Sequence, residues 1–202
     1  MSTKAVAEVI PDYLVYEVLD GQPLYYKGYL EVLAGRQKLE DIMGSSVLQF
    51  FILEYLLRLI VKADPDENYI IGNNEAGLHL EEKNNLANDI ALYPSSVLTP
   101  DKIVPYYANV PPEIIIEVDL KIAFEGLTPP DYINLKTQKL LDFGVKKVIW
   151  VFTKSRKVTI AAQGQPWITD SWDNSFELFN GIEFNIGARL RKKGVNLDPN
   201  AS

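Results

Sequence analysis

The chain has 202 residues, of which 47% are hydrophobic and 23% charged, the composition of one globular domain with enough length for a substantial core. It has no cysteine and a single histidine, His79, which excludes disulfides, thiolate catalysis, Cys-ligated metal centres and multi-histidine metal sites within one chain. The net charge of −7 argues, for the chain as a whole, against a polyanionic partner.

The N-terminal half is predicted to contain a hairpin, two helices and short strands. Two apolar, aromatic runs flank Asp20-Gly21, a favoured hairpin turn. GRQKLEDI is predicted to form a short helix, and GSSVLQFFILEYLLRLI a long one. Ser45 or Ser46 can cap the long helix, and its apolar residues run round most of its surface, so we expect it to be covered on most sides. Strands are expected near Tyr69–Ile71, Leu78–Leu80 and Asp89–Tyr93.

The C-terminal half begins with an unusual strand, PPEIIIEVDLK, from Pro111 to Lys121. A helix is predicted from Thr128 to Gly144, because Thr128 can cap its start and Gly144 can close its end. Two apolar strands, KKVIWVF and RKVTIA, and an Asn-Gly hairpin, FELFNGIEFNI, follow.

The order of these elements predicts an α/β fold. A strand, a helix and a second apolar strand between Glu113 and Phe152 form a βαβ unit, and the flanking hairpins add antiparallel strands. We therefore expect a mixed β-sheet flanked by helices, with N- and C-terminal hairpins. Residues 1–10 are expected to be a flexible N-terminus, 11–193 a single domain and 194–202 a disordered tail.

The sequence indicates neither membrane insertion nor export. The longest apolar stretch, Val47–Val61, is interrupted by Gln49, Glu54 and Arg58 and is shorter than a bilayer span. The N-terminus, MSTKAVAEVIPDY, lacks the apolar core of a secretory signal. The lack of cysteine is typical of a reducing compartment, so we expect a cytoplasmic protein.

Two acidic residues on predicted strands are candidate metal ligands. Because side chains alternate along a strand, Glu117, Asp119 and Lys121 share the face opposite to the core. A buried carboxylate needs a cation or an ion pair, and Glu117 would meet Asp89 if their two strands are neighbours. Two oxygen donors without histidine or cysteine suit Mg²⁺ or Mn²⁺. The alternative for Asp89 is a turn residue at the start of a strand.

The predicted helix carries a lysine within its apolar stripe. At 3.6 residues per turn, Lys136 lies one turn after Tyr132 and one turn before Leu140. It must extend to water, form a structural ion pair with Glu117, or act at an acidic site. The acidic strand immediately before the helix is the nearest source of an anion.

Positive charge is concentrated in two segments. Seven lysine and arginine residues lie within 136–157, opposed only by Asp142, and four more lie within 189–193. Solvated side chains are the commoner explanation of such runs. The alternative is a local basic face, which would suit a nucleic acid.

From Tyr13 to about Ile186 the chain resembles the Uma2 family of restriction-endonuclease-like proteins, within the PD-(D/E)xK nuclease superfamily. The matching pieces, in order, are YEVLDGQPLYY, NDIALY, PPEIIIEV and KTQKLLDFGVKKVIWVF. The resemblance implies a restriction-endonuclease-like core and a divalent-metal-dependent endonuclease that hydrolyses DNA phosphodiester bonds. It implies that Asp89 and Glu117 hold Mg²⁺ or Mn²⁺ with the Val118 carbonyl, and that Lys136 orients or deprotonates the attacking water.

The chain departs from the family pattern at three positions. Asn88 precedes Asp89 where the family has proline, which is not a ligand. Asp119 stands where the superfamily usually has its lysine, and it could be a further ligand or a solvent-facing strand end. Lys121 therefore competes with Lys136 as the site lysine, and we favour Lys136 because of its position in the helix stripe.

Three functions are consistent with these features. The first is a DNA endonuclease that acts as a homodimer, because cutting both strands of a duplex favours two sites. The second is a catalytically silent binding or assembly protein that kept the fold, which the net acidity supports. The third is a hydrolase of another phosphate ester that uses the same ligands.

Overall fold

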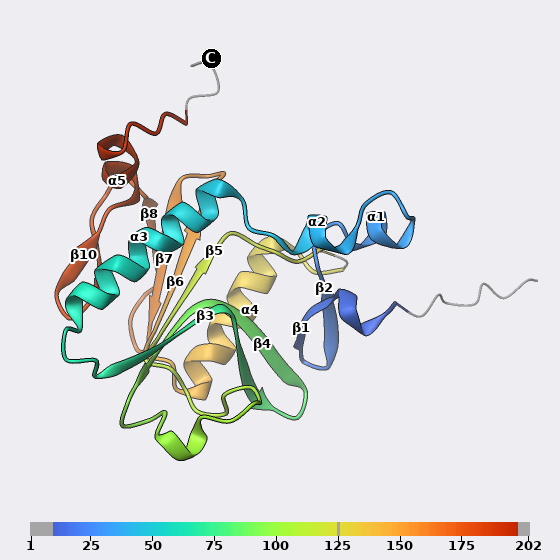
Figure 1. Cartoon of the computed structure of the whole chain (residues 1–202), viewed down its shortest axis with the longest axis horizontal. Coiled ribbons are helices and arrows are strands. Elements are labelled where there is room, and N and C mark those ends of the chain that lie inside the picture. The colour runs from blue at the N-terminus through green and yellow to red at the C-terminus, as the bar shows by residue number, and fades with distance from the viewer. Residues whose placement is uncertain (1–9, 125, 198–202) are drawn as a thin grey trace, which may run out of the picture.

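The computed structural model describes residues 10–124 and 126–197 (Figure 1). Its helices are η1 (Asp12–Leu14), α1 (Tyr29–Leu33), α2 (Leu39–Met43), α3 (Val47–Ala63), η2 (Pro100–Lys102), α4 (Pro129–Phe143) and α5 (Ile186–Lys192). Its strands are β1 (Val15–Leu19), β2 (Gln22–Tyr25), β3 (Tyr69–Glu81), β4 (Asn84–Pro94), β5 (Ile114–Val118), β6 (Lys147–Phe152), β7 (Lys157–Ala162), β8 (Ile168–Ser171), β9 (Phe176–Phe179) and β10 (Ile182–Phe184). The predicted mixed α/β architecture is confirmed.

One eight-stranded sheet dominates the structure. Its order is β2-β1-β4-β5-β6-β7-β8, and β3 pairs along β4. β5 and β6 run parallel with α4 between them in the chain, so the predicted βαβ unit is present. The other pairs are antiparallel, and β9 and β10 form a separate hairpin. Both predicted hairpin turns are confirmed, because Asp20-Gly21 and Asn180-Gly181 have the positive φ angles that such tight turns require.

Helices α3 and α4 cover opposite faces of this sheet (Figure 1). Leu140 of α4 belongs to the same core as Ile115, whereas Leu56 of α3 belongs to the same core as Ile116. Ile115 and Ile116 are adjacent in β5 and therefore project to opposite faces. The continuous apolar run of β5 thus fills two cores at once.

Helix α4 begins and ends where its sequence predicts. The Thr128 hydroxyl accepts the N–H of Asp131 at 3.3 Å, and Gly144 adopts a left-handed φ of 115° that ends the helix. Its buried face includes Tyr132, Thr137 and Lys136. These caps fix the phase of the helix and hence the direction in which Lys136 points.

Helix α3 is less covered than its composition suggests. Ser46 caps it by accepting the N–H of Gln49 at 3.2 Å. Its buried stripe consists of Gln49, Ile52, Leu56 and Ile60. Phe50 and Val61 are 54% and 62% exposed, so one flank of the helix is open. Phe51, Tyr55 and Leu59 are half-buried against the same core, so the expected cover is present on the other sides.

Several elements differ from the predicted boundaries. β3 and β4 form one long hairpin whose register shifts between Asn73 and Ala76, where the two intervening residues have positive φ. The strand predicted to continue to Lys121 ends at Val118, because Asp119 adopts a left-handed φ of 62°. Helix α5, at Ile186–Lys192, was not predicted, and α1 occupies part of the run assigned to the first hairpin.

The predicted ends of the domain lie mostly outside the described residues. Residues 1–9 and 198–202 are not described, so the flexible N-terminus and most of the disordered tail stay predictions. Val195 and Leu197, within the predicted tail, pack against the core on the α3 side. Across 10–124 and 126–197 no helix is long and apolar enough to cross a bilayer.

Candidate active site

Strands β4 and β5 bring the two predicted metal-binding acids together. Ile90 pairs with Ile116 in antiparallel register. Asp89, the residue before Ile90, therefore lies opposite Glu117, the residue after Ile116. Both carboxylates are buried. Asp89 Oδ2 accepts the N–H of Val118 at 2.8 Å, which fixes its side chain against β5. The expected convergence of Asp89 and Glu117 is present.

Lys136 lies behind these acids in a closed ionic cluster. Its side chain is 0% exposed, and Nζ donates to Glu17 Oε2 at 2.9 Å and to the Ala87 carbonyl at 2.8 Å. Nζ also lies 2.8 Å from Glu117 Oε1. The Tyr132 hydroxyl donates to the other Glu17 oxygen at 2.6 Å. Three oxygen neighbours match the three protons of an ammonium, so Lys136 does not extend to water.

Burial sets the protonation of this cluster. Burial raises the pKa of the Glu117 carboxyl to about 7, against the opposing charge of Lys136 and with the help of the Asp89 charge. Burial alone would lower the pKa of Lys136, but Glu117 and Glu17 outweigh it and raise that pKa well above its ordinary value. The carboxyl groups of Glu17 and Glu117 therefore share the ammonium of Lys136. Near neutral pH the Glu117 carboxyl gains and loses a proton.

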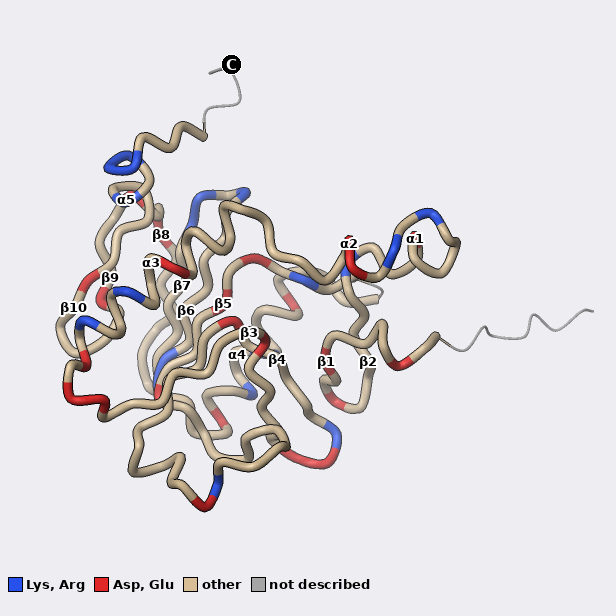
Figure 2. Tube along the Cα trace, in the orientation of Figure 1, with Lys and Arg blue, Asp and Glu red and all other residues tan. Residues whose placement is uncertain are grey.

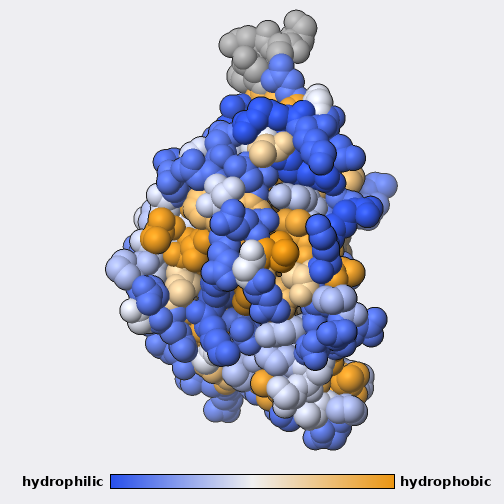
Figure 3. Space-filling view, turned by 90° about the vertical axis from the view of Figure 1, so that its left-hand side faces the viewer, coloured by the Kyte–Doolittle hydropathy of each residue, from blue (hydrophilic) through white to orange (hydrophobic). Residues whose placement is uncertain are grey.

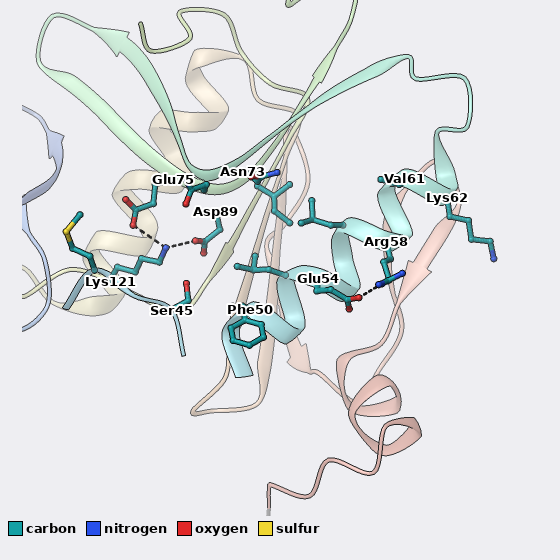
Figure 4. Close-up of a pocket in the computed structure, with 15 residues that line it drawn as sticks. Ser45, Phe50, Glu54, Arg58, Val61, Lys62, Asn73, Glu75, Asp89 and Lys121 are labelled. Carbon is teal, nitrogen blue, oxygen red and sulfur yellow. Dashed lines mark hydrogen bonds and ion pairs between the residues drawn. The ribbon is translucent and has the colours of Figure 1, made fainter. Parts of the chain in front are cut away.

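Lys121 forms an outer pair with Asp89. Its Nζ donates to Asp89 Oδ1 at 2.7 Å and lies 3.6 Å from Glu75 Oε1, and its side chain is 18% exposed (Figure 4). The Tyr26 hydroxyl donates to Glu75 Oε2 at 3.0 Å. Burial would lower the pKa of Lys121, but Asp89 and Glu75 raise it. Of the two candidate lysines, Lys121 is the one that reaches solvent.

The remaining predicted residues are engaged by other protein groups. The Val118 carbonyl accepts the side-chain amide of Gln49 at 2.7 Å. Asp119 turns away from Asp89, and its two oxygens accept the N–H and hydroxyl of Thr153 at 2.7 and 2.6 Å. The alternation that placed Asp119 beside Glu117 fails because the strand ends at Val118. Asp119 thus closes the end of β5 against the residue after β6.

The donor set fits a hard divalent cation that keeps most of its waters. Asp89 and Glu117 supply carboxylate oxygens, the ligands that Mg²⁺ and Mn²⁺ prefer. Glu117 Oε1 lies 2.8 Å from the ammonium of Lys136, so a cation bound there would share this carboxylate with Lys136. Across 10–124 and 126–197, however, no three His, Cys, Asp or Glu side chains gather as a ready metal site. A cation would have two carboxylate ligands and otherwise water, the usual arrangement for Mg²⁺.

A cavity of about 720 Å³ opens beside the outer pair (Figure 4). Asp89 and Lys121 line it, together with Glu75 and Asn74 from the irregular part of β3. Helix α3 supplies the opposite wall. The ionic cluster around Lys136 is not part of the lining, so a ligand in this cavity meets Lys121 first.

Three polar residues of the site were not predicted from the sequence. Glu17 is the deepest of them and comes from β1, where it lies between the apolar neighbours Tyr16 and Val18. Gln49 interrupts the apolar run of α3, and Glu75 lies in a turn-rich segment. An acid inside an apolar strand was the signal that identified Glu117, and the same signal is present at Glu17.

The two basic segments do not form one continuous basic face. Lys and Arg alternate with Asp and Glu along the trace (Figure 2). Ion pairs join six of the basic side chains to carboxylates: Lys136 to Glu17 and Glu117, Lys139 to Asp20, Lys146 to Glu113, Lys147 to Glu177, Arg189 to Glu54 and Arg191 to Asp173. Ion pairing or exposure to solvent therefore accounts for most of the basic side chains in these two segments.

The fold is a mixed α/β core in which helices flank one large sheet. The chain is similar to the crystal structure of "a putative nuclease belonging to DUF820" from Anabaena variabilis ATCC 29413. The TM-score is 0.62 at 11% identity, over 85% of this chain and 87% of that chain, a likeness that shows the fold alone. No family model and no curated protein matches the sequence itself.

Proposed function

We propose that the protein is a nuclease that hydrolyses phosphodiester bonds of DNA with Mg²⁺ or Mn²⁺ bound by Asp89 and Glu117. The observation that carries the proposal is the adjacency of these two buried carboxylates, of which Asp89 lines a cavity open to solvent. A nuclease-like fold supports it. The bound ion would activate water and neutralise charge on the scissile phosphate.

The two lysines have different roles in this proposal. Both ammonium groups have raised pKa values, so each is protonated at neutral pH and acts as a hydrogen-bond donor, not as a base. Lys121 lines the cavity and would release Asp89 to the cation and donate to a phosphate oxygen. Lys136, enclosed between Glu17 and Glu117, is a positioning residue that holds Glu117 from behind. The geometry therefore favours Lys121 over Lys136 as the lysine that meets substrate.

Plasmid nicking tests the proposal. Purified protein with Mg²⁺ or Mn²⁺ is expected to relax supercoiled DNA, and the isosteric variant Glu117→Gln to lose that activity. Glu113→Gln is the matched control, because Glu113 precedes the same strand but pairs with Lys146. Equal cleavage by wild type and Glu117→Gln, or no cleavage with either ion, would contradict catalysis at this site.

A catalytically silent nuclease-fold protein is the second candidate. One observation favours it: the protein itself already neutralises the site, because Lys121 binds Asp89 and Gln49 binds the Val118 carbonyl. Calorimetric titration with Mn²⁺ separates the two candidates. Folded protein without saturable binding of Mn²⁺ would favour the silent form.

A homodimer and a cytoplasmic location also belong to the proposal. Cleavage of both strands of a duplex favours two sites, which a twofold dimer supplies. Sedimentation equilibrium of the purified protein measures this state directly, and a monomer at all concentrations would remove the dimer from the proposal.

A further inference from the structure

The cavity beside Asp89 continues along α3 as a groove. Lys121 and Asp89 lie at one end, near Phe50, and Arg58 and Lys62 lie at the other (Figure 4). From Phe50 to Lys62 the helix rises about 18 Å, at 1.5 Å per residue. That length accommodates several nucleotides at the 3.4 Å spacing of a stacked strand, and fewer if they are unstacked.

The walls of the groove are mostly apolar. The apolar lining residues are Met43, Phe50, Leu53, Leu57, Val61 and Ile90. The charged lining residues balance, with three cations against the carboxylates of Glu54, Glu75 and Asp89. Exposed hydrophobic residues lie among hydrophilic ones on the side of the molecule that carries α3 and β10 (Figure 3).

This chemistry does not match the backbone of a DNA duplex. A duplex-binding surface typically neutralises 6–10 phosphates with lysine and arginine. The groove offers only Lys121, Arg58 and Lys62, and Arg58 is already paired with Glu54. A cavity of about 720 Å³ is in the range of pockets that enclose small ligands, and it is too small for a double helix. An unstacked base presents the flat apolar surface that these walls fit.

We infer that the groove binds single-stranded nucleic acid, with a base stacked on Phe50 and a flanking phosphate at Lys121. The inference rests on the proposed function, because it places the scissile phosphate beside Asp89. Phe50 is 54% exposed and is the large aromatic residue on the open flank of α3. It lies on the flank of α3 opposite to the buried residues Ile52 and Leu56. Lys62 holds a phosphate further along the strand.

Fluorescence anisotropy tests the inference without requiring cleavage. The probe is a labelled oligothymidylate of about eight nucleotides, a length that one binding module typically covers. It is titrated with the full chain in EDTA and compared with a labelled hairpin duplex in whose stem thymidines pair with deoxyadenosines. Wild type is expected to bind the single strand more tightly than the duplex. The slope of log K against log salt should be no steeper than about −2, because at most three phosphates are neutralised.

Variants identify the stacking residue. Phe50→Ala is expected to weaken binding of the single strand by about 5- to 160-fold, the range for loss of one base–aromatic contact. Val47→Ala is the matched control, because Val47 is on the same helix, 72% exposed and outside the lining. Phe50→Trp should keep binding, and its emission should be quenched by the oligonucleotide. Lys62→Ala, which removes an exposed side chain without affecting packing, should make the salt slope shallower by about 0.7.

Each outcome has one meaning. Tighter binding of the duplex, or equal binding by wild type and Phe50→Ala, overturns the inference. A wild-type dimer that Phe50→Ala dissociates also overturns it, because a second copy then covers the groove. Binding as expected without cleavage of the same oligonucleotide in Mg²⁺ or Mn²⁺ supports the groove and contradicts the proposed nuclease. Cleavage of the duplex without cleavage of the single strand supports the proposed nuclease and contradicts binding of single strands in the groove.

Discussion

Removal of the buried ammonium of Lys136 should destabilise the protein strongly. In Lys136→Met the side-chain length is kept and the positive charge is lost, so Glu17 and Glu117 remain buried and uncompensated. Breaking a buried ion pair in this way typically costs about 3–5 kcal/mol. For a domain of this size that corresponds to a fall in Tm of about 6–20 °C, at 2–4 °C per kcal/mol.

Urea unfolding followed by circular dichroism measures this loss. The matched control is Lys139→Met on the same helix, whose partner Asp20 is half exposed, so a loss of at most about 1 kcal/mol is expected. The triple variant Lys136→Met, Glu17→Gln, Glu117→Gln should recover much of the lost stability, because no charge is then left buried. A loss below about 1 kcal/mol in Lys136→Met would refute the description of a closed ionic cluster.

Three further predictions address the site. Lys121→Met should abolish most nicking activity and lower the free energy of unfolding by about 1–3 kcal/mol, because Asp89, whose side chain is 3% exposed, loses its ammonium partner; unchanged nicking would contradict the contact of Lys121 with substrate. Asp119→Ala should cost about 1–2 kcal/mol, through loss of its bonds to Thr153, and leave calorimetric Mn²⁺ affinity unchanged; a matching fall in affinity would make Asp119 a ligand. The pKa of Glu117 is raised from 4.5 to about 7 in the folded protein, so the free energy of unfolding should fall as the pH rises from about 4.5 to 7. Mn²⁺ binding needs the ionised carboxylate, so Mn²⁺ affinity should rise about tenfold per pH unit up to pH 7. Glu117→Gln should remove both pH dependences.

Local signals in the sequence predicted much of the fold. Caps at Thr128 and Gly144 determined α4, and the two turn pairs determined the hairpins. The β3–β4 hairpin was predicted only as fragments, because the segment GNNEAG breaks the strand alternation at a bulge. Helix α5 has only seven residues, too few for a periodic pattern to distinguish it from a loop.

The site was only partly predictable for a different reason. Asp89 and Glu117 could be paired because each is an acid at one end of a predicted apolar strand, on the condition that the two strands are neighbours, which the β4–β5 pairing meets. The choice between Lys121 and Lys136 depends on which ammonium reaches the cavity, and this is a property of packing that no local pattern records. The sequence placed Asp119 on the wrong side, because a single left-handed residue reverses the alternation.

The partner of Lys136 has a consequence for how the protein assembles. Glu17 and Lys136 are separated by 119 positions in the chain. During synthesis, Glu17 leaves the ribosome long before the cation that neutralises it, so it must remain hydrated until most of the polypeptide exists. Strand β1 can therefore pair with β4, with Glu17 buried, only late in the folding of the chain.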